Sequence, residues 1–206
     1  MQNDALFLML HSPHVMIYAA APKGLDAMEY KIKKLTPDDL TPNLLQHFTR
    51  YQEVKKCWRH ENGAWVLKDI PFIDDWDNAK KNEIITIDLP RCMDGGGTVW
   101  GVFNVRGHLI AFASLSGVAW GSSGQYLQLI QLHTSREYRG LGIGKALFAV
   151  VADHARQCGA RKLYISTHSS EESQHFYFRV GCVDAAEINT AITTREPYDR
   201  QMEFVL

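Results

Sequence analysis

The sequence of 206 residues predicts a single α/β domain, and three observations support this prediction. Several segments alternate apolar and polar residues with the period of a strand, whereas the segment after Gly142 has the period of a helix. Gly and Pro residues separate these segments at short intervals, with no internal repeat. Hydrophobic residues make up 46% and charged residues 22%, which excludes disordered, collagen-like and coiled-coil chains.

The net charge and the spacing of the cysteines and histidines exclude several classes of partner and site. The formal net charge of -1 leaves no basic surplus for nucleic acid or for an anionic membrane surface, so neither partner is expected. The four cysteines form no Cys-x-x-Cys pair and the nine histidines no His-x-x-x-His pair, so neither a disulfide scaffold nor a metal site is expected. These features predict a protein of the reducing cytoplasm.

The domain is expected to occupy residues 28–206, preceded by an N-terminal extension at 1–27. Met28 is followed at once by a segment, Glu29–Leu35, with the pattern of a half-buried strand. The apolar stretches before it, Ala5–Leu10 and Val15–Ala21, are too short to span a bilayer. They also lack the positive region that opens a secretion signal.

The next part of the chain is predicted to be mainly helix and loop. Thr36–Asp39 provides a cap, a proline and acidic residues for the start of a helix that buries Leu44, Leu45 and Phe48. Strand-like runs follow between residues 57 and 67. Residues 71–76 combine aromatic and acidic side chains and are interpreted as a loop that serves as a lid. A short helix is expected at Asp77–Glu83.

Three consecutive antiparallel strands are predicted next, because β-branched and aromatic residues alternate with turn signals. They are Thr98–Val105, Leu109–Leu115 and Tyr126–Leu132. The remaining elements are a helix that begins near Gly142 and stops at Gly159, a strand at Lys162–Ser166, a helix at Glu171–Phe178 capped by Ser169 or Ser170, and a last strand at Gln201–Leu206. The strand, helix and strand between 126 and 166 predict a right-handed crossover between parallel neighbours.

The loop before the first of these helices carries the clearest functional signal. Gly140, Gly142 and Gly144 stand at alternate positions, so the backbone can approach a bulky anion and direct several amide N–H groups toward it. The helix that follows adds the positive end of its dipole, which predicts a diphosphate ligand. Arg139 and Lys145 would add positive charge. Neither the dinucleotide spacing nor the P-loop spacing is present.

The order Arg139-x-x-Gly142-x-Gly144 resembles the acyl-CoA loop of the GNAT superfamily of N-acetyltransferases. The similarity continues on both sides of the loop. Upstream, Leu132–Tyr138 resembles the family's strand end and turn. Downstream, Ser170–Gly181 resembles the signature Asn-x-x-Ala-x-x-Phe-Tyr-x-x-x-Gly. The motifs cover residues 126–182, whereas residues 28–125 match only in their order of elements.

This resemblance implies the GNAT fold: a central mixed, mostly antiparallel sheet with a V-shaped splay between two parallel strands, flanked by helices. It implies acetyl-CoA as the co-substrate, with the pantetheine arm paired to the backbone of Leu132 and Thr134. A backbone N–H near Leu132 would stabilise the oxyanion. The resemblance places Ser170 in the cofactor-binding set, together with Arg139, Gly140, Gly142, Gly144 and Lys145.

The resemblance also implies catalytic roles. Tyr177 matches the tyrosine that gives a proton to the departing thiolate, because a phenol is protonated at neutral pH. Some members carry a glutamate base where this chain has Gln128, whose neutral amide can hold a water molecule but cannot act as a base. His133 and Glu172 are possible substitutes for that base, although a lone histidine near a strand end is more often packed or solvated.

The acceptor is expected to be a primary amine of a small molecule. Asp74, Asp75 and Glu196 would attract a cationic amine, and Trp76 would help to enclose it, with core packing as the simpler role for the aromatic residues here. Two alternatives stay open: a catalytically silent acyl-CoA-binding or sensor module, suggested by Gln128, and a protein lysine or N-terminal acetyltransferase. A homodimer is also left open.

Overall fold

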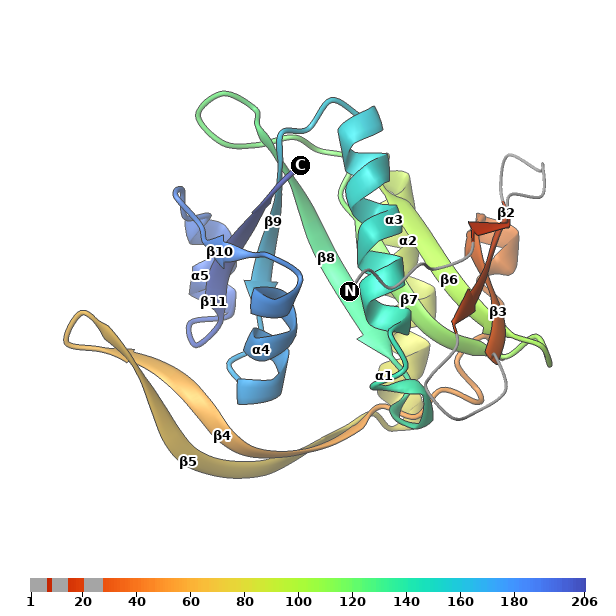
Figure 1. Ribbon diagram of the computed structural model, residues 1–206, viewed down its shortest axis with the longest axis horizontal. Helices are drawn as coiled ribbons and strands as arrows, with labels where there is room; N and C mark the ends of the chain where they lie inside the picture. Colours follow the sequence, from red (N-terminus) through yellow and green to blue (C-terminus); the bar gives the residue numbers. More distant parts are fainter. Residues whose placement is uncertain (1–6, 9–14, 21–27) are drawn as a thin grey trace.

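The computed structural model describes residues 7–8, 15–20 and 28–206 and shows one large sheet, a separate long hairpin and helices on both faces of the sheet (Figure 1). The large sheet has nine strands in the order β1-β2-β3-β6-β7-β8-β9-β11-β10. Its strands are β1 (Phe7–Leu8), β2 (Val15–Ala20), β3 (Met28–Lys34), β6 (Thr98–Asn104), β7 (Leu109–Leu115), β8 (Tyr126–Thr134), β9 (Lys162–Thr167), β10 (Val183–Asp184) and β11 (Arg200–Val205). β2 pairs with β3, so part of the segment expected to precede the domain joins the sheet edge.

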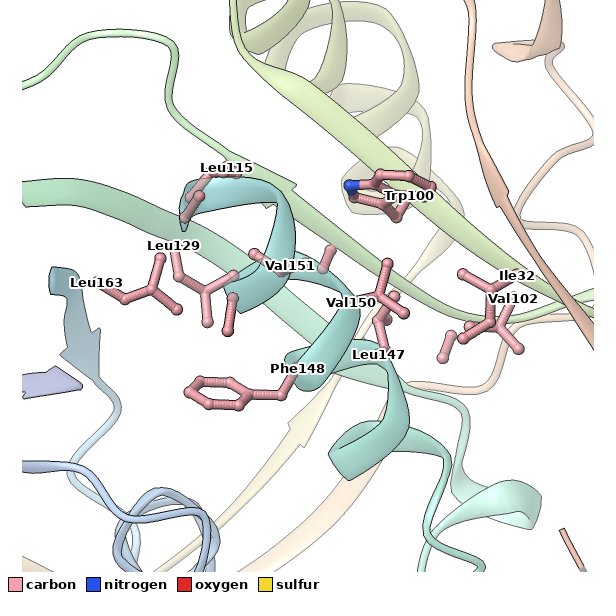
Figure 2. Close-up of a cluster of buried hydrophobic side chains, with 14 of the residues drawn as sticks. Ile32, Trp100, Val102, Leu115, Leu129, Leu147, Phe148, Val150, Val151 and Leu163 are labelled. Carbon is pink, nitrogen blue, oxygen red and sulfur yellow. The ribbon is translucent and has the colours of Figure 1, made fainter. Parts of the chain in front are cut away.

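Two apolar cores lie on opposite faces of the sheet. Helix α3 (Ile143–Gln157) covers one face, and the spacing of Leu147, Val150 and Val151 directs these side chains onto β6, β7 and β8 (Figure 2). The other face is covered by the π-helical turn η2 (Ile84–Asp88) and by α2 (Leu89–Asp94). These two layers hold the sheet rigid at the strand ends where the predicted cofactor loop begins.

The predicted splay between two parallel strands is confirmed. β8 and β9 pair in parallel only from Tyr126–Leu129 to Lys162–Ile165, and every other strand pair is antiparallel among the described residues. The register between β7 and β8 shifts at Ile130, where β8 has one residue more than its partner. Such a bulge bends a strand and increases its twist. β8 therefore turns away from β9 and runs on alone to Thr134.

The interpretation of residues 71–76 as a loop is wrong. Residues 71–75 belong to a two-stranded hairpin of β4 (Tyr51–Glu61) and β5 (Ala64–Asp75), which curves away beneath the main sheet (Figure 1), and only Trp76 lies beyond the strand. Its turn is Asn62-Gly63, with φ of 50° and 81°, the pair that such a tight turn favours. Pro71 is compatible with a strand here because the register shifts between Val54 and Lys56, which places the proline at a bulge.

The helix predicted after Thr36 is also wrong. The structure has only a 3₁₀ turn, η1 (Pro37–Asp39), followed by turns over residues 42–47. Pro42 accounts for the difference, because a proline disfavours helical geometry at the residue before it. Of the side chains predicted to be buried, Leu45 and Phe48 are nevertheless 1% exposed and belong to the second core, whereas Leu44 is half-buried and packs against it.

The helix expected at Asp77–Glu83 is confirmed as α1 (Asn78–Glu83), with Asp77 accepting a hydrogen bond from the Lys80 N–H at 2.7 Å. The chain then continues through η2 into α2. Pro90 lacks an N–H for the usual helical bond, and a π-type turn accommodates such a gap.

The elements predicted from residue 98 onward are confirmed to within two residues at each end. Helix α4 (Glu171–Arg179) begins after Ser170, whose side chain accepts a hydrogen bond from the N–H of Ser173. The sequence did not predict α5 (Thr190–Arg195), which packs against the C-terminal part of the sheet through Ile192.

Candidate active site

A cavity of about 950 Å³ opens where β8 and β9 diverge. Its walls come from the end of β8, the loop before α3, one side of α4 and the first residues of β4. The residues that line it are Arg50, Tyr51, Gln52, Glu53, Leu132, His133, Thr134, Arg136, Tyr138, Arg139, Gly140, Gly142, Gly144, Lys145, Glu172, Ser173, His175, Phe176, Tyr177, Arg179 and Val180. Of the predicted site residues, two catalytic ones and every cofactor-binding one except Ser170 meet here.

The glycine loop has the geometry of an anion site. Gly140 and Gly142 have φ of 78° and 82°, a region that side chains other than glycine rarely adopt, and an added Cβ would meet no atom within 4 Å at either position. Gly142 is also the N-cap of α3, whose first amide groups lack acceptors within the helix. The loop therefore offers free N–H groups and a positive helix end to the cavity.

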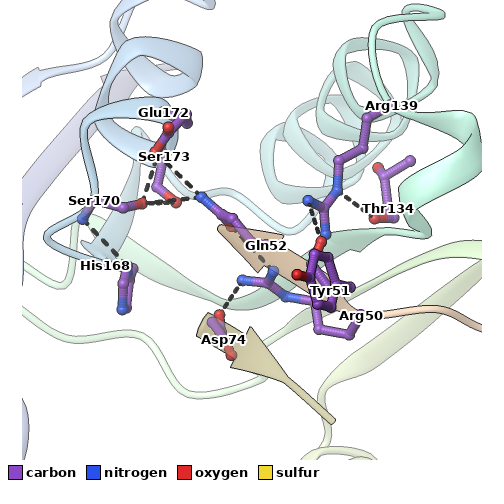
Figure 3. Close-up of polar contacts among 10 residues, drawn as sticks. All are labelled: Arg50, Tyr51, Gln52, Asp74, Thr134, Arg139, His168, Ser170, Glu172 and Ser173. Atoms are coloured by element: carbon purple, nitrogen blue, oxygen red, sulfur yellow. Dashed lines mark hydrogen bonds and ion pairs between the residues drawn. The ribbon is translucent and has the colours of Figure 1, made fainter. Parts of the chain in front are cut away.

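Arg139 also makes hydrogen bonds to the protein backbone. Its Nε donates to the carbonyl oxygen of Thr134 at 3.1 Å, and its Nη1 donates to the carbonyl oxygen of Tyr51 at 3.0 Å. The guanidinium thus joins the end of β8 to the start of β4 (Figure 3). It still adds positive charge to the cavity, but its hydrogen bonds go to the protein, and the Thr134 carbonyl expected to face the pantetheine already accepts one.

The charge of the cavity wall suits a polyanion. Five basic side chains line it, against two carboxylates among the described residues. The basic residues are Arg50, Arg136, Arg139, Lys145 and Arg179; the acidic ones are Glu53 and Glu172. A low-dielectric wall with an excess of positive charge raises the local concentration of phosphate ligands.

Tyr177 lies on α4, beside Phe176 and with its ring edge to Phe148 at 6.3 Å between centroids. Burial raises the pKa of the phenol well above 10, and the nearby Cys182 and Asp199 add to the rise. The group is therefore protonated throughout the neutral range and available as a donor inside the cavity.

His133 also lines the cavity, but its environment makes it a weak base. Burial, together with the positive charges of Arg50 and Arg139, lowers the pKa of its imidazole to about 3. The ring packs edge-on against Trp76 at 4.7 Å and lies 5.3 Å from Phe112. At neutral pH it is uncharged and has little tendency to take up a proton.

Four predicted site residues lie outside the cavity wall. Gln128 is half-buried on β8, opposite Tyr164 of β9. Ser170 is buried as the cap of α4. Asp75 is exposed at the end of β5, and Trp76 packs into the second core against Phe48. The simpler reading of Trp76 as a packing residue fits its surroundings.

Sequence reasoning missed the strand that crosses the open end of the splay. At one end the N–H of Arg136 donates to the carbonyl of Thr49 at 2.9 Å, and at the other the N–H of Trp58 donates to the carbonyl of Ser169 at 2.8 Å. β4 therefore runs from the loop after β8 to the loop after β9 and forms the floor of the cavity (Figure 3).

We call residues 49–58 the floor strand. A network of polar contacts holds it in place. Arg50, only 8% exposed, forms an ion pair with Asp74 at 2.5 Å and donates to Gln52 Oε1 at 3.0 Å. Gln52 Nε2 in turn donates to Ser170 Oγ at 3.5 Å and to Glu172 Oε2 at 3.3 Å. The Asn62-Gly63 pair could have predicted the hairpin, but no local signal predicts where the hairpin packs.

The described helices include none that is long and apolar enough to cross a membrane. In the same residues, no group of three or more His, Cys, Asp or Glu side chains is arranged to hold a metal ion.

Comparison with known proteins agrees with the geometry. The family model of the Acetyltransferase (GNAT) family matches residues 51–182, which include most of the floor strand, the glycine loop and α4. No curated protein matches the chain in sequence.

Solved structures are similar in fold at low sequence identity. Nourseothricin acetyltransferase is 17% identical with a TM-score of 0.62, and the match covers 85% of this chain and 98% of that one. A putative streptothricin acetyltransferase from Bacillus anthracis, solved in complex with acetyl coenzyme A, is 16% identical with a TM-score of 0.60, covering 87% and 99%. AtaTR bound with AcCoA is 18% identical with a TM-score of 0.53, covering 85% and 92%.

Proposed function

Because the chain belongs to the GNAT family of acetyltransferases and is thus an acyltransferase that depends on acetyl-CoA, we propose that it transfers the acetyl group to a primary amine of a small molecule. The attack would be direct, with donor and acceptor bound together. The observation that carries the proposal is the single cavity that joins the Gly140–Gly144 loop to the Tyr177 phenol at the point where β8 and β9 diverge.

The residues present fit acetyl-CoA as the donor. The amide groups of the glycine loop and the start of α3 would hold the diphosphate, with Lys145 adding charge. In the part of the chain that the structure describes, no strand pairs with β8 on its β9 side beyond the bulge, so the backbone at Leu132 would be free to pair with an extended arm. The thioester would then lie between β8 and Tyr177.

The chemistry needs one proton to leave the amine and another to reach the sulfur. The neutral amine attacks the carbonyl carbon, the C–N bond forms, and the C–S bond breaks as the thiolate departs. Tyr177 is protonated and lies in the cavity wall, so it would donate its proton to that sulfur. Breaking the C–S bond would otherwise leave an unprotonated thiolate in the cavity.

A small-molecule acceptor is supported by the form of the site. The floor strand lies across the end of the splay and encloses the cavity from below, which suits a compact ligand better than a protein chain. The two structures of highest TM-score named above are acetyltransferases whose names refer to nourseothricin and streptothricin, both compounds rather than proteins.

The test is a screen for thiol release from acetyl-CoA. The panel should contain diamines, polyamines, amino acids and nourseothricin, with lysine-containing peptides as the protein-type alternative. We expect turnover with at least one small amine and none with the peptides. Turnover with peptides alone would contradict the small-molecule assignment. Calorimetric binding of acetyl-CoA without turnover of any amine would instead support the silent sensor module.

A further inference from the structure

The proposed reaction requires a proton acceptor for the amine, and the cavity offers few. Of the described residues in its wall, two carry a carboxylate, Glu53 and Glu172. Both residues are exposed; Glu53 lies on the floor strand and accepts a hydrogen bond from its neighbour Tyr51 at 3.0 Å. Glu172 lies instead in the first turn of α4, the helix that carries Tyr177.

Glu172 is held by a chain of polar contacts that reaches across three elements (Figure 3). Gln52 Nε2 donates to its carboxylate at 3.3 Å, and Gln52 Oε1 accepts from Arg50 Nη1 at 3.0 Å. Because Arg50 has only donors, this contact sets which end of the Gln52 amide faces Glu172. The ion pair from Arg50 to Asp74 fixes the far end of the chain.

Glu172 and Tyr177 reach the cavity from the same helix. They are five positions apart, which corresponds to about 7.5 Å along the helix axis and about 140° around it, so they lie on different sides of α4. Both line the cavity, with Ser173 and Phe176 between them on the wall. An amine bound over the floor strand would thus meet a carboxylate on one side and the thioester, with the phenol beyond it, on the other.

We propose that Glu172 is the catalytic base that takes the proton from the acceptor ammonium, and that Gln52 positions it; this rests on the acetyl transfer proposed above. The freed amine lone pair forms the C–N bond while the C–S bond breaks. Tyr177 gives its proton to the sulfur and regains one from the new amide nitrogen. Glu172 then releases the first proton to solvent, so the reaction yields the amide, the thiol and one proton.

The other candidate bases fit less well. Gln128 cannot accept a proton and lies outside the cavity wall. The low pKa of His133 makes it a weak acceptor. Asp74 is neutralised by Arg50. The charged and titratable groups around Glu172 are Arg50, Glu53 and Asp74 of the hairpin, His168 at the end of β9, and Glu171 and His175 of α4.

The test compares Glu172→Gln with Glu171→Gln, using whichever panel amine the wild type turns over fastest. Both substitutions remove one acidic side chain from the first turn of α4, but Glu171 does not line the cavity. We expect kcat/KM at pH 7 to fall about 100-fold in Glu172→Gln and less than about twofold in Glu171→Gln. The dissociation constant of acetyl-CoA should stay within about twofold in both.

The pH profile and a second variant distinguish a base from a structural residue. The deficit of Glu172→Gln should shrink as the pH rises past the pKa of the amine, because the amine then arrives without its extra proton. Gln52→Leu should lower kcat/KM about tenfold with the same acetyl-CoA affinity. Equal losses in Glu171→Gln and Glu172→Gln, full activity of Glu172→Gln, or a deficit independent of pH would each overturn the assignment.

The experiments distinguish a failure of Glu172 as the base from a failure of the proposed acetyl transfer. Wild-type turnover combined with an active Glu172→Gln would refute the base alone. A wild-type protein that binds acetyl-CoA but acetylates no amine would refute the proposed function and the base with it.

Discussion

Residues 126–182 and residues 36–97 each supply part of the same cavity, but they are built in different ways. The first region forms its wall from consecutive elements: a bulged strand, a glycine loop and two capped helices. The second reaches the cavity through a hairpin held by an ion pair and by hydrogen bonds to residues about 90 to 120 positions away. The part of the cavity that we assign to acetyl-CoA is thus built from elements that follow one another in the sequence. The part that we assign to the acceptor amine depends on contacts between residues far apart in the sequence.

The largest expected effect is a loss of acetyl-CoA affinity, and it compares one glycine from each region. Gly142 and Gly63 have nearly the same φ, 82° and 81°, and both face open space. Gly142→Glu and Gly63→Glu should therefore carry similar backbone strain, of order 1–3 kcal/mol. Only Gly142→Glu places a negative charge where the diphosphate is expected, so its affinity for acetyl-CoA should fall about 1,000-fold by calorimetry. Equal affinities of the two variants would contradict the anion site.

The next effect measures how firmly the hairpin is anchored. Asp74→Asn leaves Arg50, whose side chain is 9% exposed, without its ion partner, and should cost about 3 kcal/mol of unfolding free energy. Glu83→Gln is the control, because the Lys80–Glu83 pair is exposed on both sides and should contribute below about 0.5 kcal/mol. Urea denaturation measures both. A cost below 1 kcal/mol for Asp74→Asn would show that the floor strand has other anchors.

Tyr177→Phe tests the chemistry of the local region. The loss of the phenol should lower kcat about 100-fold while the acetyl-CoA dissociation constant changes less than twofold, because only the protonation of the thiolate is removed. Tyr198→Phe, at an exposed tyrosine outside the cavity, is the control and should leave kcat unchanged. Full turnover by Tyr177→Phe would remove this residue from the acid role.

The smallest effect concerns Asp199, whose burial raises its pKa from 3.8 to about 6. The folded chain therefore holds a proton that the unfolded chain releases, so Asp199 stabilises the fold below about pH 4 and this contribution is lost as the pH rises through 6. Between pH 4 and 7 the wild type should lose about 1 kcal/mol relative to Asp199→Asn, a figure reduced for solvent screening. Parallel stability profiles of the two proteins would contradict this.

The sequence predicted the first region well because its signals are local. Alternate glycines require positive φ whatever the rest of the chain does, and a helix period with a cap predicts α3 and α4 without distant information. The residues named from the family resemblance between Leu132 and Tyr177, apart from Ser170, line the cavity. The splay itself was inferred from the family resemblance, and the bulge at Ile130 that produces it has no signature in the sequence.

The second region was mispredicted because its signals conflict. Pro71 and the acidic pair Asp74-Asp75 are typical of a loop, yet the proline lies at a bulge and Asp74 is neutralised by Arg50. In the preceding segment Pro42 stops a helix that the cap at Thr36 favours. The contact from Gln52 to Glu172, which matters most to our view of catalysis, joins residues 120 positions apart and has no local cause.

The floor strand has a consequence for which donors the enzyme accepts. It is tied to the loops beyond both diverging strands, so the gap between them cannot widen without breaking bonds at Thr49 or Trp58. A butyryl or longer thioester is bulkier than an acetyl thioester, so a gap of fixed width should favour the shorter chain. We therefore expect the hairpin to determine which acyl chain lengths the enzyme accepts. Shortening the hairpin should extend this range to longer acyl chains.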